Sequence, residues 1–325
     1  MTEDCRCTHR IDEMHRYPIN DPQLRQHLDS IAADGIDLFM IGDGIRGALL
    51  HGTSLVNAMR ANHGLGIMET LILGHAYCAV GLMASTLKEH GRIGISMECS
   101  GPVGGINVEG TARGEIRGYL RNPNIPITSE PEDFDTSEYI GVGRISVTRY
   151  QESRKQPFTG QVLIEHGRIA RDMANYYMQS EQTPTAFNLS VKFNSDGNVT
   201  GAGGLFVQAL PEADDVTRAT VEDRIEALPS LGSAFSEGRT GADILRSSFE
   251  DLSLEITGSR TAEFFCHCSK ERFARFLAAL PDDERIDMKE NGPFPLRTTC
   301  HNCNSTYEFS RDEVQELADR IRTES

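Results

Sequence analysis

Cys266-His267-Cys268 and Cys300-His301-Asn302-Cys303 are the two short segments that decide how the C-terminal part of this 325-residue chain folds. A gap of 31 residues separates Cys268 from Cys300. Two close pairs of thiols that a fold brings together make a tetrahedral sulfur site, and zinc is its usual occupant. The spacing therefore predicts one zinc ion per chain, bound by Cys266, Cys268, Cys300 and Cys303.

Two histidines, His267 and His301, lie inside the same segments and could compete as ligands. Four thiolates suit structural zinc better than a mixed set does. One spacer residue separates Cys266 from Cys268, so the backbone must bend for both thiols to reach one metal. That bend also brings the two sulfurs near enough to oxidise together.

The four-cysteine site has two functional interpretations. As a structural staple, it would contribute on the order of 10 kcal/mol or more to folding through bound zinc. As a redox switch, its thiolates would react with oxidants, and each disulfide would remove two ligands at once. A domain this small, with few apolar residues, would then lose its fold. The rare single-spacer pair favours the switch.

Composition places the chain among soluble globular proteins: hydrophobic residues make up 38% and charged residues 25%. The formal net charge is −16, which argues against a nucleic-acid-binding surface because phosphate contacts need clustered Lys and Arg. The start of the chain is polar rather than signal-like. We expect no apolar run near the roughly 18 residues that span a membrane. A cytoplasmic protein with reduced cysteines follows.

Apolar periodicity and glycine turns predict an α+β N-terminal domain at residues 36–211, after an extension at residues 1–35. The expected helices are 53–62, 68–88 and 169–181. The expected strands are 36–41, 45–50, 93–99, 105–110, 114–120, 141–149, 161–165, 185–193 and 204–210.

Residues 212–263 are acidic and contain two short amphipathic pieces, which predict a helical linker of low intrinsic stability. Val221, Ile225 and Leu228 mark the first piece, and Leu245, Phe249 and Leu252 the second. Residues 264–325 form the small cysteine-bearing domain, with helices expected at 272–280 and 311–321 and a strand at 306–309.

Motifs for other chemistry are weak. Gly42, Gly44 and Gly47 fit a dinucleotide-binding pattern, but the residues that follow look like a strand rather than a helix, so a hairpin is favoured. The glycines at 101–105 and 201–204 indicate turns or close backbone approach. Glu165 and His166 could act as an acid and a base, and His51, His63 and His75 could gather around a site, but structural or surface roles are favoured.

The remaining cysteines are less informative. Cys5 and Cys7 form a second single-spacer pair, which could be incidental, an extra redox site or a weak metal site. An incidental pair is favoured because chain termini are usually loose. Cys78 and Cys99 lie in apolar patterns typical of small buried residues.

At this point the chain resembles the heat-shock protein 33 family of redox-regulated holdase chaperones. The resemblance runs from about Ile36 to the C-terminus, and the extension with Cys5 and Cys7 departs from it. It is carried by residues 100–105 (SGPVGG), 114–119 (GEIRGY), 176–184 (YYMQSEQTP), 202–208 (AGGLFVQ), 266–272 (CHCSKER) and 300–303 (CHNC).

The resemblance implies an ATP-independent holdase that is inactive while reduced and zinc-bound. Under oxidative stress it implies disulfides Cys266–Cys268 and Cys300–Cys303, although four cysteines allow three pairings. Zinc release would unfold the C-terminal domain and the linker. Ile225, Leu228, Leu245 and Phe249 would then bind unfolding client proteins, and the active form would be a homodimer with no membrane or nucleic-acid partner.

Two other classes stay open. One is a zinc-ribbon regulator that binds nucleic acid or a protein partner, which filter binding at low salt would reveal. The other is an enzyme built on the N-terminal domain, which a nucleotide-dependent thermal shift would reveal. The resemblance implies neither, and the chain is expected not to be an enzyme.

Overall fold

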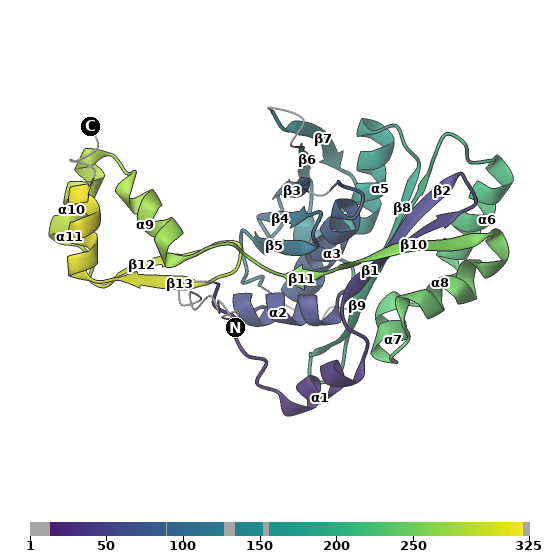
Figure 1. Cartoon of the computed structure of the whole chain (residues 1–325), viewed down its shortest axis with the longest axis horizontal. Helices are drawn as coiled ribbons and strands as arrows, with labels where there is room; N and C mark the ends of the chain where they lie inside the picture. The colour runs from purple at the N-terminus through teal and green to yellow at the C-terminus, as the bar shows by residue number, and fades with distance from the viewer. Residues whose placement is uncertain (1–13, 89, 127–133, 152–155, 321–325) are drawn as a thin grey trace, which may run out of the picture. The chain divides into compact units, whose positions relative to one another are not determined.

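The computed structural model describes residues 14–88, 90–126, 134–151 and 156–320 (Figure 1). Contacts divide these residues into two compact units. The body comprises residues from Tyr17 to Phe265, and the cysteine module comprises residues 14–16 together with residues 266–320. The boundaries predicted at residues 35, 211 and 263 remain predictions.

The body contains two largely antiparallel sheets, which confirms the α+β class. In spatial order, the first sheet consists of β10 (Leu254–Thr261), β1 (Gly35–Ile41), β2 (Ile45–His51), β9 (Val199–Ala209) and β8 (Thr185–Phe193). The second consists of β11 (Glu263–Phe264), β5 (Glu115–Leu120), β4 (Gly105–Thr111), β3 (Arg92–Cys99), β6 (Gly143–Tyr150) and β7 (Phe158–Ile164).

Helix α3 (Ile67–Ala84) packs against strands of both sheets and forms the centre of the body (Figure 1). The expectation that no apolar run approaches membrane-spanning length was wrong, since α3 has 18 residues and a mean hydropathy of 1.5 in its apolar window. However, 89% of that window is buried inside the protein. Burial on all sides explains the composition, because a helix that is apolar all round is a core helix in a globular domain.

The remaining helices that precede residue 212 cover the sheets and their connections. They are α1 (Pro22–Ser30), α2 (Thr53–His63), α4 (Ser137–Ile140) and α5 (Ile169–Ser180). The sequence interpretation placed no helix before residue 36, so α1 is an addition. Its signals are local: Asp21 caps the helix by accepting the N–H groups of Gln23 and Leu24, and Pro22 fits the first turn.

The Gly42-Asp43-Gly44 turn joins β1 and β2 in register, from Gly35 opposite His51 to Ile41 opposite Ile45. The hairpin interpretation is therefore confirmed, and the dinucleotide-loop alternative has no helix to bind phosphates. Gly42 adopts a φ of +52°, a conformation that glycine tolerates at no steric cost.

The linker was predicted to be helical with two short amphipathic pieces, but its last part forms strands. Three α-helices and a 3₁₀ turn come first: α6 (Asp215–Glu226), α7 (Leu231–Ser236), α8 (Gly241–Phe249) and η1 (Glu250–Leu252). The chain then forms β10, which pairs with β1, and β11, which pairs with β5. Every second residue of β10 is exposed. Residues 254–261 of the linker are thus an edge strand of the first sheet.

Helix α7 was also missed, because Gly232 and its serine neighbours suggest a loop. The structure explains these small residues. A Cβ atom on Gly201 of β9 would lie 1.9 Å from the carbonyl oxygen of Gly232. Glycine is needed on β9 to let the backbone of α7 approach this closely.

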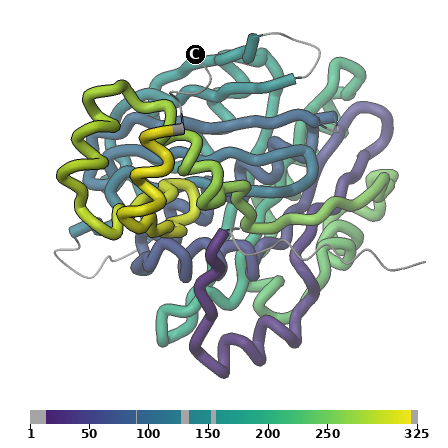
Figure 2. Tube along the Cα trace, turned by 60° about the vertical axis from the view of Figure 1, so that its left-hand side comes forward, coloured from purple at the N-terminus to yellow at the C-terminus, as the bar shows by residue number. Residues whose placement is uncertain are grey.

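The cysteine module consists of three helices and a two-stranded hairpin. The helices are α9 (Lys270–Ala278), α10 (Asp282–Asn291) and α11 (Arg311–Arg320), and the strands are β12 (Leu296–Thr299) and β13 (Thr306–Phe309). Figure 2 shows these helices, in light green to yellow, gathered in one cluster. The sequence predicted α9, α11 and β13 but neither α10 nor β12.

Candidate metal centre

The four predicted ligands lie together in the cysteine module. Cys266 and Cys268 precede α9, while Cys300 and Cys303 lie in the turn between β12 and β13. All four side chains are buried, and their Sγ atoms lie within 4.8 Å of one another. In the described part of the chain, no other group of three or more Cys, His, Asp or Glu side chains gathers in this way.

The turn that carries Cys300 and Cys303 is shaped by backbone hydrogen bonds. The N–H groups of Cys303 and Asn304 donate to the carbonyl of Cys300, and the Cys300 N–H donates to the carbonyl of Ser305. Asn304 adopts a φ of +57°, and asparagine is among the non-glycine residues that best tolerate this conformation. The tight turn directs both thiols toward the first pair.

The sulfur separations suit a tetrahedral thiolate site. Cys266 Sγ lies 3.8 Å from Cys300 Sγ, and Cys268 Sγ lies 3.2 Å from Cys303 Sγ. Four sulfurs bound at about 2.3 Å in a tetrahedron lie about 3.8 Å apart. The four cysteines carry no disulfide among the described residues. The cluster can therefore hold a metal ion with only small shifts of the sulfurs.

The thiols influence one another's acidity. A hydrogen bond with Cys266 raises the pKa of Cys268, but hydrogen bonds with Cys300 and Cys303 outweigh it and lower the pKa to about 7. Hydrogen bonding with Cys266 raises the pKa of Cys300 and of Cys303. One thiolate is thus favoured, while further ionisation in so small a space needs a cation to offset the charge.

Two hydroxyl groups contact the sulfurs. The hydroxyl of Tyr307 lies 3.2 Å from Cys268 Sγ, and Cys303 Sγ donates a 3.2 Å hydrogen bond to Ser305 Oγ. Neither residue is evident from the cysteine spacing, although both lie within four residues of Cys303, Ser305 just before β13 and Tyr307 on it. Hydrogen bonds of this kind orient metal ligands.

His267 and His301 are exposed and lie outside the group of gathered ligand atoms. The gathered cluster therefore consists of the four thiols and does not include these imidazoles.

The other candidate residues lie in separate places. His51 stacks on Phe235 with ring centroids 4.3 Å apart, and the His63 ring lies 6.3 Å from that of Phe264. His75 lines a cavity of about 450 Å³ beside Arg168 and Asp135. The three histidines therefore form no common site, as was favoured.

Cys78 is fully buried and Cys99 is partly buried. Burial raises the pKa of Cys78 to about 12 and that of Cys99 to about 11, which leaves both thiols protonated and unreactive at neutral pH. Cys5 and Cys7 lie outside the described residues.

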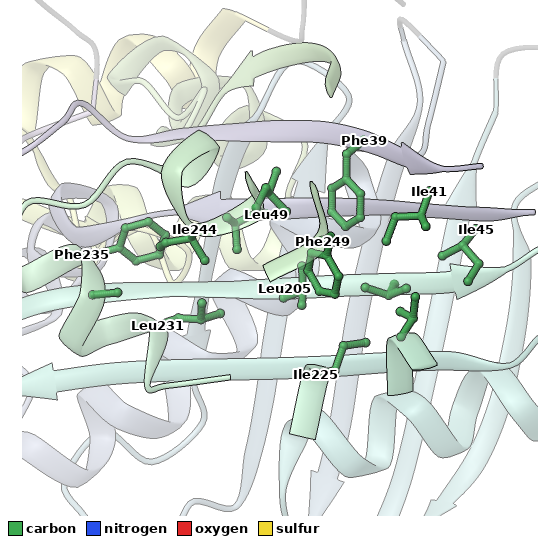
Figure 3. Close-up of a cluster of buried hydrophobic side chains, with 14 residues drawn as sticks. Phe39, Ile41, Ile45, Leu49, Leu205, Ile225, Leu231, Phe235, Ile244 and Phe249 are labelled. Atoms are coloured by element: carbon green, nitrogen blue, oxygen red, sulfur yellow. The ribbon is translucent and has the colours of Figure 1, made fainter. Parts of the chain in front are cut away.

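The linker residues predicted to bind clients are covered in this state. Ile225, Leu245 and Phe249 are buried, and Leu228 packs beside them. They face the first sheet of the body, as Figure 3 shows for the labelled side chains. The sheet contributes Phe39, Ile41, Ile45, Leu49, Leu205 and Val207 to this cluster, and the linker contributes Val221, Ile225, Leu231, Ala234, Phe235, Ile244, Leu245 and Phe249.

An α+β body that continues into a compact module with a buried cluster of four thiols that could hold a metal ion defines a class of cysteine-centred proteins. The Hsp33 protein family profile matches residues 34–310, and the chain belongs to this chaperone family.

Curated relatives and a solved structure agree with this membership. The chain is 34% identical to a 33 kDa chaperonin of Desulforamulus reducens, over 83% of this chain and 91% of the relative. It is 33% identical to one of Halalkalibacterium halodurans, over 84% and 94%. The crystal structure of the 33 kDa chaperonin (heat shock protein 33 homolog) from Thermotoga maritima matches with a TM-score of 0.80 and 29% identity, covering 90% of this chain and all of that one.

Proposed function

We propose that this protein is a redox-regulated, ATP-independent holdase whose switch is the four-cysteine centre. The observation that carries the proposal is the gathering of four buried thiols in a module directly joined to a linker whose apolar residues are covered. Family membership supplies the chaperone role, and the curated relatives are named chaperonins.

Cys266, Cys268, Cys300 and Cys303 would hold zinc, the metal that most often occupies tetrahedral four-thiolate sites. Bound zinc would supply the positive charge that lets four neighbouring sulfurs stay deprotonated. The small module would depend on it, because a binding free energy of this kind is also folding free energy.

The switching step is thiol oxidation. Each peroxide molecule would take two electrons from a pair of thiolates and two protons from the solvent, giving one disulfide and two molecules of water. Two such events would remove all four ligands. We propose the pairs Cys266–Cys268 and Cys300–Cys303, which leave each disulfide within a short loop. All four sulfurs lie within 4.8 Å of one another, which is compatible with any pairing, so peptide mapping must decide it.

Client binding would follow from the release of the linker. When the module unfolds, β11 and β10 lose the folded segment that follows them, and the short helices α6 to α8 lose their anchor. Ile225, Leu228, Leu245 and Phe249 would become available, and so would the sheet face that they cover. Exposed apolar surface of this kind would bind unfolded client chains. It could equally bind a second copy of this chain in the proposed active homodimer.

The proposed setting is the cytoplasm, where glutathione and thioredoxin keep thiols reduced until oxidative stress intervenes. Gly42 to Gly47 lie in the β1–β2 hairpin and form no phosphate-binding loop. This is in keeping with the proposed activity, which needs no nucleotide.

The deciding experiment is light scattering from a heat-unfolding client protein. One arm contains the reduced, zinc-loaded protein, and the other contains protein pretreated with peroxide at elevated temperature. Suppressed aggregation in the oxidised arm alone is the expected result. Equal behaviour in both arms would reduce the cysteine centre to a structural staple.

A further inference from the structure

A short N-terminal segment, residues 14–16, belongs to the cysteine module although about 250 residues separate it from Cys266. Met14 is buried, with 8% of its surface exposed. The backbone N–H of His15 donates a 2.8 Å hydrogen bond to Ser305 Oγ, and this hydroxyl lies 3.4 Å from the carbonyl oxygen of His15, to which it donates in turn. The segment therefore docks on the β13 side of the cysteine turn.

The docking residues are the same ones that contact the sulfurs. Ser305 accepts a hydrogen bond from Cys303 Sγ, and Tyr307 contacts Cys268 Sγ. The His15 ring lies 5.3 Å from the Tyr307 ring at an angle of 45°. Ser305 is fully buried and Tyr307 nearly so. One short segment thus reaches the two side chains that flank the metal centre on one side.

The chain enters the body immediately afterwards. The backbone N–H of Tyr17 donates a 3.1 Å hydrogen bond to Asn62 Oδ1 of α2. The polypeptide consequently passes between module and body twice, once after Arg16 and once after Phe265. The family profile begins at residue 34, so the first passage lies outside the matched region.

We propose that Met14, His15 and Arg16 form an N-terminal strap that stabilises the metal-loaded module and raises the oxidant exposure needed to release the metal. This regulation rests on the proposed switch at the cysteine centre. A segment that binds the folded module but not the unfolded one stabilises the folded state by mass action. Because the strap is covalently attached, it binds at a high effective concentration.

The test measures zinc release from full-length, zinc-loaded protein at limiting peroxide, followed with a chromogenic chelator. Met14→Ser/His15→Gly removes the buried side chain and the ring contact. Its matched control is Met178→Ser/His90→Gly, which changes an exposed methionine and an exposed histidine of the body. We expect the strap variant to release zinc about fivefold faster or more, a factor that small stability losses produce.

A second variant and a second readout guard against an indirect effect. His15→Pro removes the N–H donor to Ser305, and hydrogen exchange of the reduced, zinc-loaded protein should then be faster at residues 300–307. Release rates and exchange equal to those of the control would overturn the strap.

Cys5→Ser/Cys7→Ser tests the alternative that thiols of the extension act instead. This variant keeps the strap, so we expect zinc release at the unmodified rate. A change as large as that of Met14→Ser/His15→Gly would assign the effect to thiol chemistry and overturn the docking role. None of these readouts needs a client protein, so a failed light-scattering experiment and a failed strap remain distinguishable.

Discussion

Some single residues in the body contribute to packing and also make the stability of the fold depend on pH. His51 lies on β2 with 5% of its surface exposed, its Nε2 lies 2.8 Å from Thr53 Oγ1, and its ring stacks on Phe235 of α7. Burial lowers the pKa of His51 to about 4, partly opposed by a hydrogen bond with the Ala33 backbone. The residue thus couples protonation to the surface that the linker covers.

Acid should weaken the body through His51. The unfolded chain binds a proton near pH 6.5 and the folded one near pH 4, so stability present above about pH 6.5 is lost as pH falls toward about pH 4. His51→Gln should reduce the loss between pH 7 and about pH 5 by roughly 2 kcal/mol at most. Urea unfolding at both pH values checks this, with the exposed His90→Gln as control; an unchanged pH dependence would contradict it.

Two other groups, both partly buried, shape the same pH profile. Burial lowers the pKa of His75 to about 4, which adds to the loss in acid. Burial raises the pKa of Asp34 to about 6, against the N–H groups of Leu55 and Ser54 that lower it. Since the folded state then holds the extra proton, Asp34 restores some stability as pH falls below about 6.

At the cysteine centre, one sulfur should decide metal content. Cys268→Ser replaces one of the four proposed thiolate ligands by a hydroxyl that binds zinc poorly, so zinc should fall well below one ion per chain. Elemental analysis of the reduced protein checks this. Cys99→Ser is the matched control, because Cys99 lies on β3 of the body. Zinc content equal to that of the control would remove Cys268 from the ligand set.

At the scale of elements, the linker helices have local start signals despite their short lengths. Asp214 caps α6, Ser230 caps α7, and Thr240 with Asp243 forms a capping box on α8. Arg224 of α6 forms a bidentate ion pair with Asp251 of the 3₁₀ turn. Caps set where such helices begin, but helices of 6 to 12 residues persist through burial of their apolar faces.

Removing one large side chain from that face should therefore loosen the linker. Phe249 is 1% exposed and its ring stacks 6.1 Å from that of Phe39. Phe249→Ala should cost about 3 to 5 kcal/mol of local stability and speed amide exchange in α6 to α8 of the reduced protein. Val216→Ser on the exposed side of α6 is the control. Equal amide exchange in the two variants would show that packing of Phe249 in the apolar cluster does not keep the linker folded.

If the proposed function is right, Phe249→Ala should also suppress client aggregation without peroxide. If the reduced variant has a loosened linker but does not suppress aggregation, release of the linker is not sufficient for client binding. That result would direct attention to the oxidised module instead.

At the scale of the whole molecule, the two units should respond differently to metal removal. The module is small and centred on its thiols, whereas the body has α3 buried between two sheets. A strong chelator added to reduced protein should raise amide exchange at residues 266–320 while α3 stays protected. Unchanged exchange at residues 300–307 would mean that the module folds without metal.

Several features of this molecule could be predicted from local sequence. The spacing of Cys266, Cys268, Cys300 and Cys303 predicted a centre that the structure gathers, because few residue types bind metal and short spacers limit where they point. The β1–β2 hairpin and the central helix were also predictable, since turns and apolar runs are encoded by neighbouring residues.

Other features were decided by the tertiary structure alone. The pairing of β10 with β1, the close approach of α7 to Gly201 and the docking of His15 on Ser305 each join segments far apart in the chain. His15 and Ser305 are 290 residues apart. Local periodicity carries no information about such partners, because an alternating segment such as β10 becomes a strand only when a sheet edge is present to satisfy its backbone hydrogen bonds.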